Sequence, residues 1–422
     1  MKKNIIYIIS ILLICSSCSK VEFDEKQSTA FFKLFGSNYI DAGFDIKQTP
    51  DEGYIITGEI EIEEVEKDII NHTNLLAIKT DKYGNYLWVK HFGDSLDDVG
   101  NCVQILQNGN YLFFGTTTID TKNDNNEEND NKDLFIVILN EVGDTIRIDV
   151  LGNKFNEKGN YAVQADNGDF IFVGSMENRR FMMRIDSSLS DTIWHDTSIT
   201  QNNSEYIDIL KLNSDKYYFT YNKYNSSQKT SGYPLGSIMD GISGTIDYST
   251  SYPVSSTSRI CRSSVLLPDK SIVIVGQMDN DNTDIYLAKF NYPYEYTNIV
   301  WEKSISAYGN INSYDVGLDI KLTNDNNLVL VGYTNASKPD SALIQTEIND
   351  LENNYDSYIA KLDTGGNVLW DTTYGGLGDQ IANAVIQSTD GRYVFVGSTE
   401  FVEGNNLIFM IKVNSEGILK FE

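Results

Sequence analysis

Tyr393-Val-Phe-Val-Gly397 is the last and clearest copy of a pattern in which an aromatic or apolar residue is followed, four positions later, by Gly. Tyr54 and Tyr393 are 339 residues apart, so the six intervals between seven copies average about 56 residues. A repeat of this length built from short strands predicts a propeller or a solenoid. The other copies are Tyr54/Gly58, Tyr111/Gly115, Phe170/Gly174, Ile272/Gly276 and Leu328/Gly332, with a seventh aligned at Tyr218, where Asn222 replaces Gly.

Each repeat contains four predicted strands, which we call A to D. In the last repeat, strand A covers 382–388, strand B 393–397 and strand C 407–413, and Ile418 begins strand D. Runs of β-branched and aromatic residues bounded by Gly, Asn and Asp are typical of strands. The chain after its first 17 residues shows no sustained apolar period of 3.6 residues, so we expect an all-β protein.

All four Trp residues fall on predicted strand D. Two copies match closely, Asp81-Lys-Tyr-Gly-Asn-Tyr-Leu-Trp88 and Asp363-Thr-Gly-Gly-Asn-Val-Leu-Trp370, and Gly follows each Trp five residues later, at Gly93 and Gly375. One interpretation is a platform on which a ligand stacks. The other, which we favour because the spacing follows the repeat, is that each ring fills the wedge between neighbouring blades. The predicted structural residues are therefore Trp88, Trp194, Trp301, Trp370, Gly58, Gly115, Gly174, Gly276, Gly332 and Gly397.

Seven repeats favour a closed seven-bladed β-propeller, because closure removes sheet edges that would otherwise pair with other chains. The segment Phe31-Phe-Lys-Leu-Phe-Gly36 has the strand D pattern and precedes the first strand A. We predict that it completes the blade formed by residues 382–421, although the C-terminal residues 417–422 also offer a strand D. The fourth repeat, residues 202–253, lacks both the Gly and the Trp, which indicates a degenerate blade or an irregular ring.

The N-terminus predicts export. Residues 1–17 combine Lys2-Lys3 with an apolar run, 5–14, that is too short to span a bilayer. Ser16-Ser17-Cys18 resembles the end of a bacterial lipoprotein signal, which implies that Cys18 is lipidated and that 18–30 is a tether to one domain, 31–422. Cys15 stands where Leu is usual in such signals, so a secreted, unlipidated product is the alternative.

The composition excludes some partners. The formal charge is −27, or −29 after removal of the two signal-segment lysines, which argues against nucleic acid as a partner. Cys102 and Cys261 fall on strand A of the second and fifth blades, on opposite sides of the ring. A disulfide needs Cα atoms within about 7 Å, so we expect two buried thiols.

Acidic insertions between strands B and C are the candidate binding face, because these loops emerge together and per-repeat insertions often carry binding. The alternative is that exposed loops tolerate polar insertions at little cost. The residues concerned are Glu61, Glu63, Glu64, Glu66, Asp124, Glu127, Glu128 and Asp130.

Catalytic and metal motifs are weak in this sequence. Asp279, Asp281 and Thr283 suggest the start of a calcium loop, but Asp284 and Phe290 replace its expected Gly and Glu. The three His residues lack metal-ligand spacing, and the chain contains no Gly-x-Ser-x-Gly elbow and no phosphate loop. We therefore expect no cofactor, with calcium as the alternative.

The combined repeat unit is Gly…Asp-x-Ala/Gly…Asp-Gly-x-Tyr-x-x-x-Gly…Lys-x-Asp-x-x-Gly-x-x-x-Trp…Tyr-Gly-Gly. It resembles the β-propeller repeats of secreted and surface proteins of Bacteroidota, close to the delta-60 type, over about residues 31–422. That resemblance implies a propeller and an exported location, but no single activity. Glu22, Asp24 and Glu25 resemble the acidic export tag of surface lipoproteins of the same bacteria.

The segment from Asp363 to Trp370 is similar to the tryptophan-docking motif of quinoprotein dehydrogenases. Its Asp-to-Gly spacing is one residue shorter, and the chain has no adjacent Cys pair to stack on a quinone.

The leading functional hypothesis is a lipid-anchored lipoprotein of the outer membrane or cell surface that binds a glycan, peptide or partner protein through one propeller face. A secreted or periplasmic location is the alternative. Two other functions stay open: an exported enzyme, either a polysaccharide lyase or hydrolase or a quinoprotein, with its site at the central channel, and a structural spacer in a surface complex.

Overall fold

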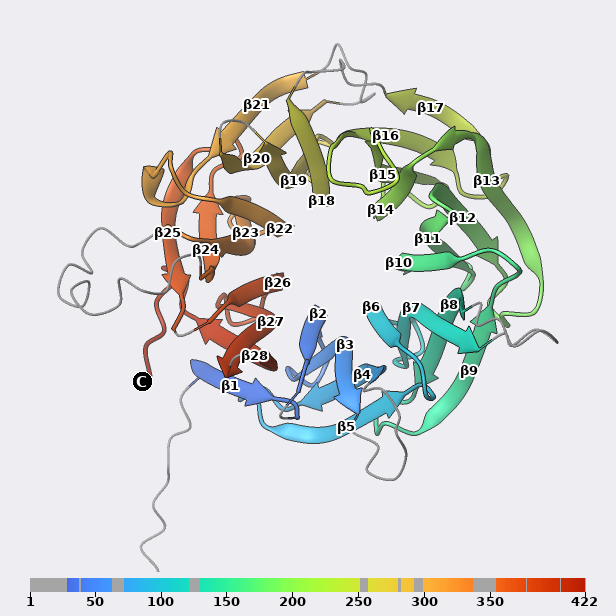
Figure 1. The fold of residues 1–422 in the computed structure, drawn as a ribbon, viewed down its shortest axis with the longest axis horizontal. Helices are drawn as coiled ribbons and strands as arrows, with labels where there is room; N and C mark the ends of the chain where they lie inside the picture. The colour runs from blue at the N-terminus through green and yellow to red at the C-terminus, as the bar shows by residue number, and fades with distance from the viewer. Residues whose placement is uncertain are drawn as a thin grey trace, which may run out of the picture.

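Seven four-stranded antiparallel sheets surround a common axis as the blades of a propeller (Figure 1). The computed structural model describes residues 29–37, 39–62, 72–120, 130–250, 257–279, 282–291, 299–336, 354–376, 378–402 and 404–421. Within these residues the predicted all-β, seven-bladed fold is confirmed. The fourth repeat is a complete four-stranded blade, β14-β15-β16-β17, rather than a gap in the ring.

Each blade runs from an innermost strand A to an outermost strand D, and we number the blades 1 to 7 along the chain. Strand A is β2 (Ala42–Gln48), β6 (Asp98–Ile105), β10 (Glu157–Gln164), β14 (Ser204–Lys211), β18 (Ser258–Leu266), β22 (Asp315–Leu322) or β26 (Gln380–Gln387). Strand B is β3 (Tyr54–Ile62), β7 (Tyr111–Asp120), β11 (Phe170–Met176), β15 (Lys216–Tyr224), β19 (Ile272–Asp279), β23 (Leu328–Thr334) or β27 (Tyr393–Val402).

The outer half of each blade consists of strands C and D. Strand C is β4 (His72–Thr80), β8 (Asp130–Leu139), β12 (Arg179–Ile185), β16 (Gly232–Asp240), β20 (Thr283–Phe290), β24 (Asp356–Leu362) or β28 (Asn405–Val413). Strand D is β5 (Tyr86–Phe92), β9 (Thr145–Leu151), β13 (Thr192–Asn202), β17 (Ile246–Thr250), β21 (Ile299–Ile305), β25 (Val368–Tyr374) or β1 (Phe31–Phe35). A short 3₁₀ turn, η2 (Ala307–Gly309), precedes β22.

The N-terminal strand closes the ring, as predicted. β1 pairs antiparallel with β28, with Phe31 opposite Lys412 and Phe35 opposite Ile408. Among the described residues after β28, 414–421 contain a turn but no strand, so the N-terminal segment occupies the strand D position of blade 7. Phe31 lies in the place that Trp takes in other blades, with its ring 3.0 Å from the position of a Cβ on Gly84 of blade 1.

A β-bulge in strand A explains the recurring Gly of strand B. The register of every strand A shifts at the equivalent residue, and the Gly pairs with the residue before the shift, as Gly115 does with Gly100. A Cβ on Gly115 would lie 1.8 Å from the carbonyl oxygen of Val99. Only Gly permits this approach of two backbones. The bulged residues are Phe44, Asn101, Asn160, Ile207, Arg262, Leu318 and Asn383.

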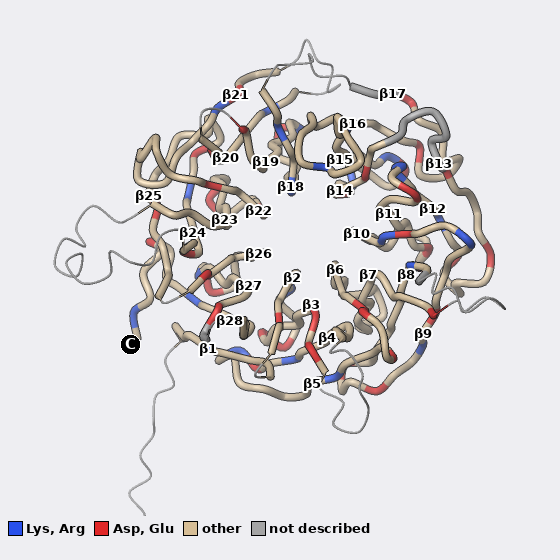
Figure 2. Tube along the Cα trace, in the orientation of Figure 1, with Lys and Arg blue, Asp and Glu red and all other residues tan. Residues whose placement is uncertain are grey.

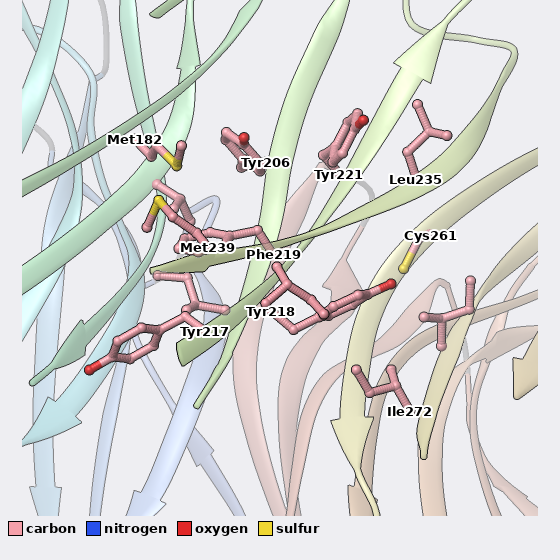
Figure 3. Packing of buried hydrophobic residues seen from close by; sticks show 14 of the residues in the cluster. Met182, Tyr206, Tyr217, Tyr218, Phe219, Tyr221, Leu235, Met239, Cys261 and Ile272 are labelled. Carbon is pink, nitrogen blue, oxygen red and sulfur yellow. The ribbon is translucent and has the colours of Figure 1, made fainter. Parts of the chain in front are cut away.

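The sequence alignment of the fourth repeat was wrong by one residue. Register places Tyr217, opposite Lys211, at the anchor position, and Tyr221, opposite Tyr206, at the Gly position. Where other blades hold two small residues, blade 4 therefore holds two tyrosines whose ring centroids are 5.5 Å apart. The guanidinium of Arg180 lies 4.4 Å from the Tyr221 ring centroid, and Figure 3 shows these rings among the large side chains of the blade 4 core.

The Trp residues fill the wedges between blades, as the repeat spacing predicted. Trp88 of blade 1 lies against Gly143 of blade 2, where a Cβ would be 2.9 Å from the ring. Trp194, Trp301 and Trp370 lie in the same way against Gly244, Gly366 and Gly417 of the following blade, and all four glycines have positive φ. A side chain at these turns would displace the ring, so the Trp and Gly positions depend on each other.

The junction between blades 2 and 3 lacks both the Trp and the Gly, which supports the conclusion that the two positions depend on each other. Leu189 holds the positive-φ position of the C–D turn of blade 3, with φ of 54°, and blade 2 carries Arg147 in place of Trp. Arg147 Nη2 donates to the carbonyl oxygen of Leu189 at 3.2 Å, and its Nη1 donates to that of Ser188. A Trp ring at this position would need a Gly in the turn of the next blade. Where that turn holds Leu189 instead, the guanidinium of Arg147 takes the place of the ring and bonds to the carbonyl groups of the turn.

Paired charges account for the Lys and Asp of the repeat. Lys79 is only 2% exposed and pairs with Asp51 of the A–B turn at 2.8 Å. Lys412, 4% exposed, pairs with Asp390 at 2.7 Å and lies 5.7 Å from the ring centroid of Tyr54 in the next blade. A buried ammonium is tolerated only with such partners.

The two cysteines after the signal segment lie where they were predicted. Cys102 on β6 and Cys261 on β18 are buried and free. Burial raises the pKa of both thiols, that of Cys102 to about 12, so neither is a reactive thiolate.

The closing strand yields a stability prediction with a matched control. Phe31 is 4% exposed and its neighbour Phe32 is 46% exposed. Phe31→Ala removes the ring from the seam between blades 7 and 1 and should lower the free energy of unfolding by about 3–5 kcal/mol. Phe32→Ala should change it by less than about 1 kcal/mol. Urea unfolding followed by Trp fluorescence measures both, and equal losses would contradict closure by packing of Phe31.

Candidate functional site

The candidate site is the cavity on the propeller axis. Its volume is ≈ 520 Å³, and side chains of strand A from all seven blades line it. Strands A meet at the axis, so their bulged residues and the residues next to them converge there (Figure 1). Polar residues that are far apart in the sequence therefore meet in one cavity.

Asn residues at the bulge join neighbouring blades around the cavity. Asn101 Nδ2 donates to the carbonyl oxygen of Gly159 in blade 3 at 2.7 Å. Asn160 Nδ2 donates to Tyr206 O in blade 4 at 2.7 Å, and Asn383 Nδ2 donates across the closing seam to Gly43 O at 2.9 Å. These three amides therefore form hydrogen bonds across the junctions between blades.

Asp residues after the bulge join the other four junctions. Asp45 accepts from Val103 N, Asp208 from Ser264 N, and Asp319 from Val385 N, each at 3.0 Å. Ser263 Oγ also donates to Asp319 at 2.8 Å, which links blades 5 and 6. Carboxylates held by backbone N–H groups of the next blade are structural, so they are poor candidates for acid–base catalysis.

Lys321 is the cation inside the cavity. Its Nζ lies 2.5 Å from Asp319, and its side chain is 31% exposed because it borders the open cavity. Burial disfavours the ammonium, but the carboxylates of Asp319 and Asp208 outweigh that effect and raise the pKa of Lys321. A lysine held in its charged form is a binding group rather than a nucleophile.

A group of cations that we call the channel-mouth cluster comprises Lys158, Lys229 and Arg262 together with Glu205. The Glu205 carboxylate is 4% exposed and lies 2.9 Å from Lys158 Nζ and 2.5 Å from Lys229 Nζ. Burial alone would raise the pKa of Glu205, but the two ammonium groups outweigh it and lower that pKa to about 2. Two lysines thus share one carboxylate, while Arg262, which lines the same cavity, donates to Gln277. Figure 2 shows Lys or Arg positions on β10 and β18, two of the strands that border the centre of the ring.

Three tyrosines on blade 6 form a second exposed group, the tyrosine platform. Ring centroids of Tyr314 and Tyr355 are 5.6 Å apart, and those of Tyr333 and Tyr355 are 5.0 Å apart. All three side chains are half-buried. Burial and Tyr314 raise the pKa of Tyr333 to about 12, while the positive charge of Arg262 on the preceding blade acts in the opposite direction.

Pairs of buried polar groups at the blade junctions are not a catalytic dyad. Burial and Asp133 raise the pKa of Glu157 to about 7, and burial raises the pKa of Asp98 to about 6. Such shifts often mark active sites. Here a buried carboxyl recurs at the start of strand A, as in Asp315, whose pKa burial also raises. A Gly approaches the carboxylate of Asp98 at one junction and that of Asp133 at the next, as Gly93 and Gly152 do. Recurrence at several junctions identifies these carboxyls as scaffold.

The predicted acidic binding loops lie mostly outside the described residues, so they stay a prediction. Glu61 is on β3, is buried, and accepts from Ile40 N at 2.9 Å, so it is a structural residue rather than part of an exposed face. Asp130 begins β8. Glu63, Glu64, Glu66, Asp124, Glu127 and Glu128 lie outside the described residues.

The calcium candidates do not form a described site. Asp279 accepts from Thr283 Oγ1 at 3.2 Å across the β19–β20 hairpin, and Asp281 lies outside the described residues. Within the part of the chain that the structure describes, no group of three or more His, Cys, Asp and Glu side chains is placed to hold a metal ion. In the same residues no helix is long and apolar enough to cross a membrane.

Sequence reasoning missed Lys158, Lys229 and Arg262. An alignment of the seven strands A contains the signal for two of them. Lys158 stands two residues before the bulge, where Ala42, Val99 and four other residues that are not cationic stand, and Arg262 is the only cation at a bulge position. Lys229 lies in a B–C connection and has no counterpart in the repeat pattern.

The comparisons with known proteins identify no family for this chain. No protein-family model matches the chain, and no curated protein matches it. Among solved structures, Sqt1 from Chaetomium thermophilum has a TM-score of 0.47 at 10% identity, covering 92% of this chain and 98% of that one. The periplasmic gluconolactonase PpgL of Pseudomonas aeruginosa has a TM-score of 0.49 at 8% identity, covering 80% and 87%. The α-L-arabinanase of Penicillium chrysogenum has 0.43 at 10%, covering 92% and 99%.

Glu157 gives a pH prediction. Its folded pKa of about 7 lies above the ordinary 4.5, so the folded chain holds a proton that the unfolded chain releases. Stability should therefore fall as pH rises from about 4.5 to about 7. In Glu157→Gln the amide N–H replaces the carboxylic O–H at every pH. The variant should match the parent near pH 4 and be about 1–2 kcal/mol more stable at pH 8.

Urea unfolding across this pH range measures the effect, and Glu141→Gln, at an exposed acid in a C–D turn, is the control. A stability difference between the Glu157 variant and the parent that stays constant with pH would contradict the raised pKa of Glu157 in the folded chain.

Proposed function

We propose that this protein is an exported, lipid-anchored surface propeller that binds a glycan, peptide or partner protein through one face and catalyses no reaction. One observation carries the proposal: at the axial cavity the aspartates bond to neighbouring blades, whereas cations at its mouth remain accessible. Lys158 is 52% exposed and Arg262 is exposed, while Asp45, Asp208 and Asp319 are buried.

Binding is favoured over catalysis by the state of the polar groups. A general base must reach the substrate proton with a free lone pair. Asp45 accepts from Ile46 N, from Val103 N of the next blade and, at both oxygens, from Lys47 Nζ. Asp208 accepts from Ile209 N and from both the backbone N–H and the hydroxyl of Ser264, so most of the acceptor sites of the two carboxylates are taken. Cations with exposed ammonium or guanidinium groups can instead hold an anionic ligand without changing it.

Surface location rests on the N-terminal segment. Lys2-Lys3, the apolar run and Ser16-Ser17-Cys18 support export with lipidation at Cys18, and acyl chains bind a bilayer by about 0.8 kcal/mol per buried methylene. The first described residue, Thr29, lies two residues before β1, the outer strand of blade 7.

Location is tested by Cys18→Ala. Because the acyl chains would be the only membrane attachment of the proposed protein, the variant should leave the membrane fraction and lose incorporation of radiolabelled palmitate. Cys15→Ala is the matched control and should change neither. Palmitate incorporation that survives Cys18→Ala would contradict lipidation at this residue.

Function is tested with the purified protein and a panel of polysaccharides and peptides. We expect saturable binding of a panel member with no change in the ligand after prolonged incubation, as measured by calorimetry and product chromatography. Turnover of a polysaccharide would overturn the binding-only function in favour of an exported enzyme. Strong self-association with no ligand bound would favour a structural spacer.

A further inference from the structure

The lining of the axial cavity contains four cations and four carboxylates, but three of these carboxylates, Asp45, Asp208 and Asp319, are buried and bonded to neighbouring blades. The formal charge of the chain is −27, yet the channel-mouth cluster contains three cations and one carboxylate. A local excess of one sign in a cleft concentrates ligands of the opposite sign.

The cations are arranged rather than scattered. Glu205 connects the members of the cluster. Its Oε1 accepts a hydrogen bond from Asn160 Nδ2 at 2.7 Å, and the same carboxylate forms ion pairs with both lysines. Lys229 has a left-handed backbone, with φ of 56°, and its Nζ lies 5.6 Å from the Tyr224 ring centroid. Arg262 Nη2 donates to Gln277 Oε1 at 3.0 Å. A buried carboxylate that orients exposed ammonium groups is the usual construction of an anion site.

The tyrosine platform belongs to blade 6, whose strand β22 packs against β18, the strand that carries Arg262. Its half-buried rings of Tyr314, Tyr333 and Tyr355 combine an apolar face with a hydroxyl. A pyranose ring has an apolar C–H face and a polar edge, so it packs well on such rings. A peptide would instead need an apolar groove with pockets for its side chains. The residues that line the cavity are mostly polar or charged, which favours a saccharide over a peptide.

We propose that the mouth of the cavity binds an acidic glycan, with its carboxylate or sulfate groups on Lys158, Lys229 and Arg262 and a sugar ring on the tyrosine platform. This inference rests on the proposed binding function and names its ligand class. Carboxylate and sulfate share the chemistry that an ammonium or guanidinium recognises, so the source of the anion is left to the experiment.

The experiment uses the full mature chain and three probes: oligogalacturonate for carboxylate, chondroitin sulfate oligosaccharide for sulfate, and linear arabinan oligosaccharide as a neutral glycan. We expect one or both acidic probes to bind, and their affinity to fall at least about tenfold between 50 and 500 mM NaCl, since ion contacts are screened by salt. Arabinan should bind at least about tenfold more weakly than the better acidic probe.

Variants locate the site. Arg262→Gln and Lys158→Gln should each weaken the acidic probe about five- to tenfold, and Tyr333→Ala should weaken it by a similar factor. Lys82→Gln is the matched control, because it removes one charge from an exposed C–D turn on the opposite face, where Lys82 pairs with Glu52 at 3.2 Å. It should leave binding unchanged. Urea unfolding midpoints within experimental error of the parent show that each variant is folded.

The outcomes separate this inference from the proposed function. Binding of arabinan that Arg262→Gln does not change would overturn the acidic-glycan inference and leave the binding function intact. So would tighter binding of a glutamate-rich peptide than of any glycan. Acidic probes that bind equally well to Arg262→Gln, Lys158→Gln and the parent would overturn the site, as would failure of every glycan to bind. Cleavage of a bound acidic glycan would overturn the non-enzymatic function while supporting the ligand class.

Discussion

Pairing of β1 with β28 is the contact on which the ring depends. Each blade packs against only two neighbours, and blade 7 has no outer strand until residues 31–35 supply one. The same strand places Phe31 over Gly84, while Asn383 bonds Gly43 and Lys412 lies over Tyr54 on the inner side of the seam. The closing junction thus reproduces the contacts of the other junctions, and the two ends of the chain are held as firmly as consecutive blades. Without it, two blades would expose faces that now pack together.

The bulge in strand A connects this architecture to the polar site. A bulge leaves backbone groups of the inner strand without ladder partners, and the Asn and Asp side chains at the bulge satisfy such groups in the next blade. Asn101 reaches Gly159, and Asp319 reaches Val385. The axial carboxylates are therefore occupied by the requirements of the fold. Lys and Arg side chains carry no hydrogen-bond acceptor, so they cannot bond to a backbone N–H of the next blade as Asp does. Lys158 and Arg262 lie at the channel mouth instead.

The sequence predicted most of the fold and little of the site. Period, blade number, closing strand, wedge position of the Trp residues and buried thiols were all predicted, because each follows from a local pattern that repeats. The fourth repeat was aligned one residue away from its true register, since Tyr217, Tyr218, Phe219 and Tyr221 are all aromatic and no Gly marks the position. Only the pairing of β14 with β15 decides which of these side chains faces the core, because a shift of one residue exchanges the faces of a strand.

The sequence by itself determined the contacts in which the backbone or ring of one segment leaves no space for a side chain on its neighbour. Gly115 is Gly because Val99 O leaves no room for a Cβ, and Gly143 is Gly because the Trp88 ring lies on its Cα. These are steric constraints between short segments, so they leave a periodic trace in the sequence. Tertiary structure alone decided which charges meet at the channel mouth. Lys158, Lys229 and Arg262 come from blades 3, 4 and 5, and only the curvature of the closed ring brings their side chains to one cavity. Charges interact through distance in space rather than separation along the chain, and that distance has no periodic signature.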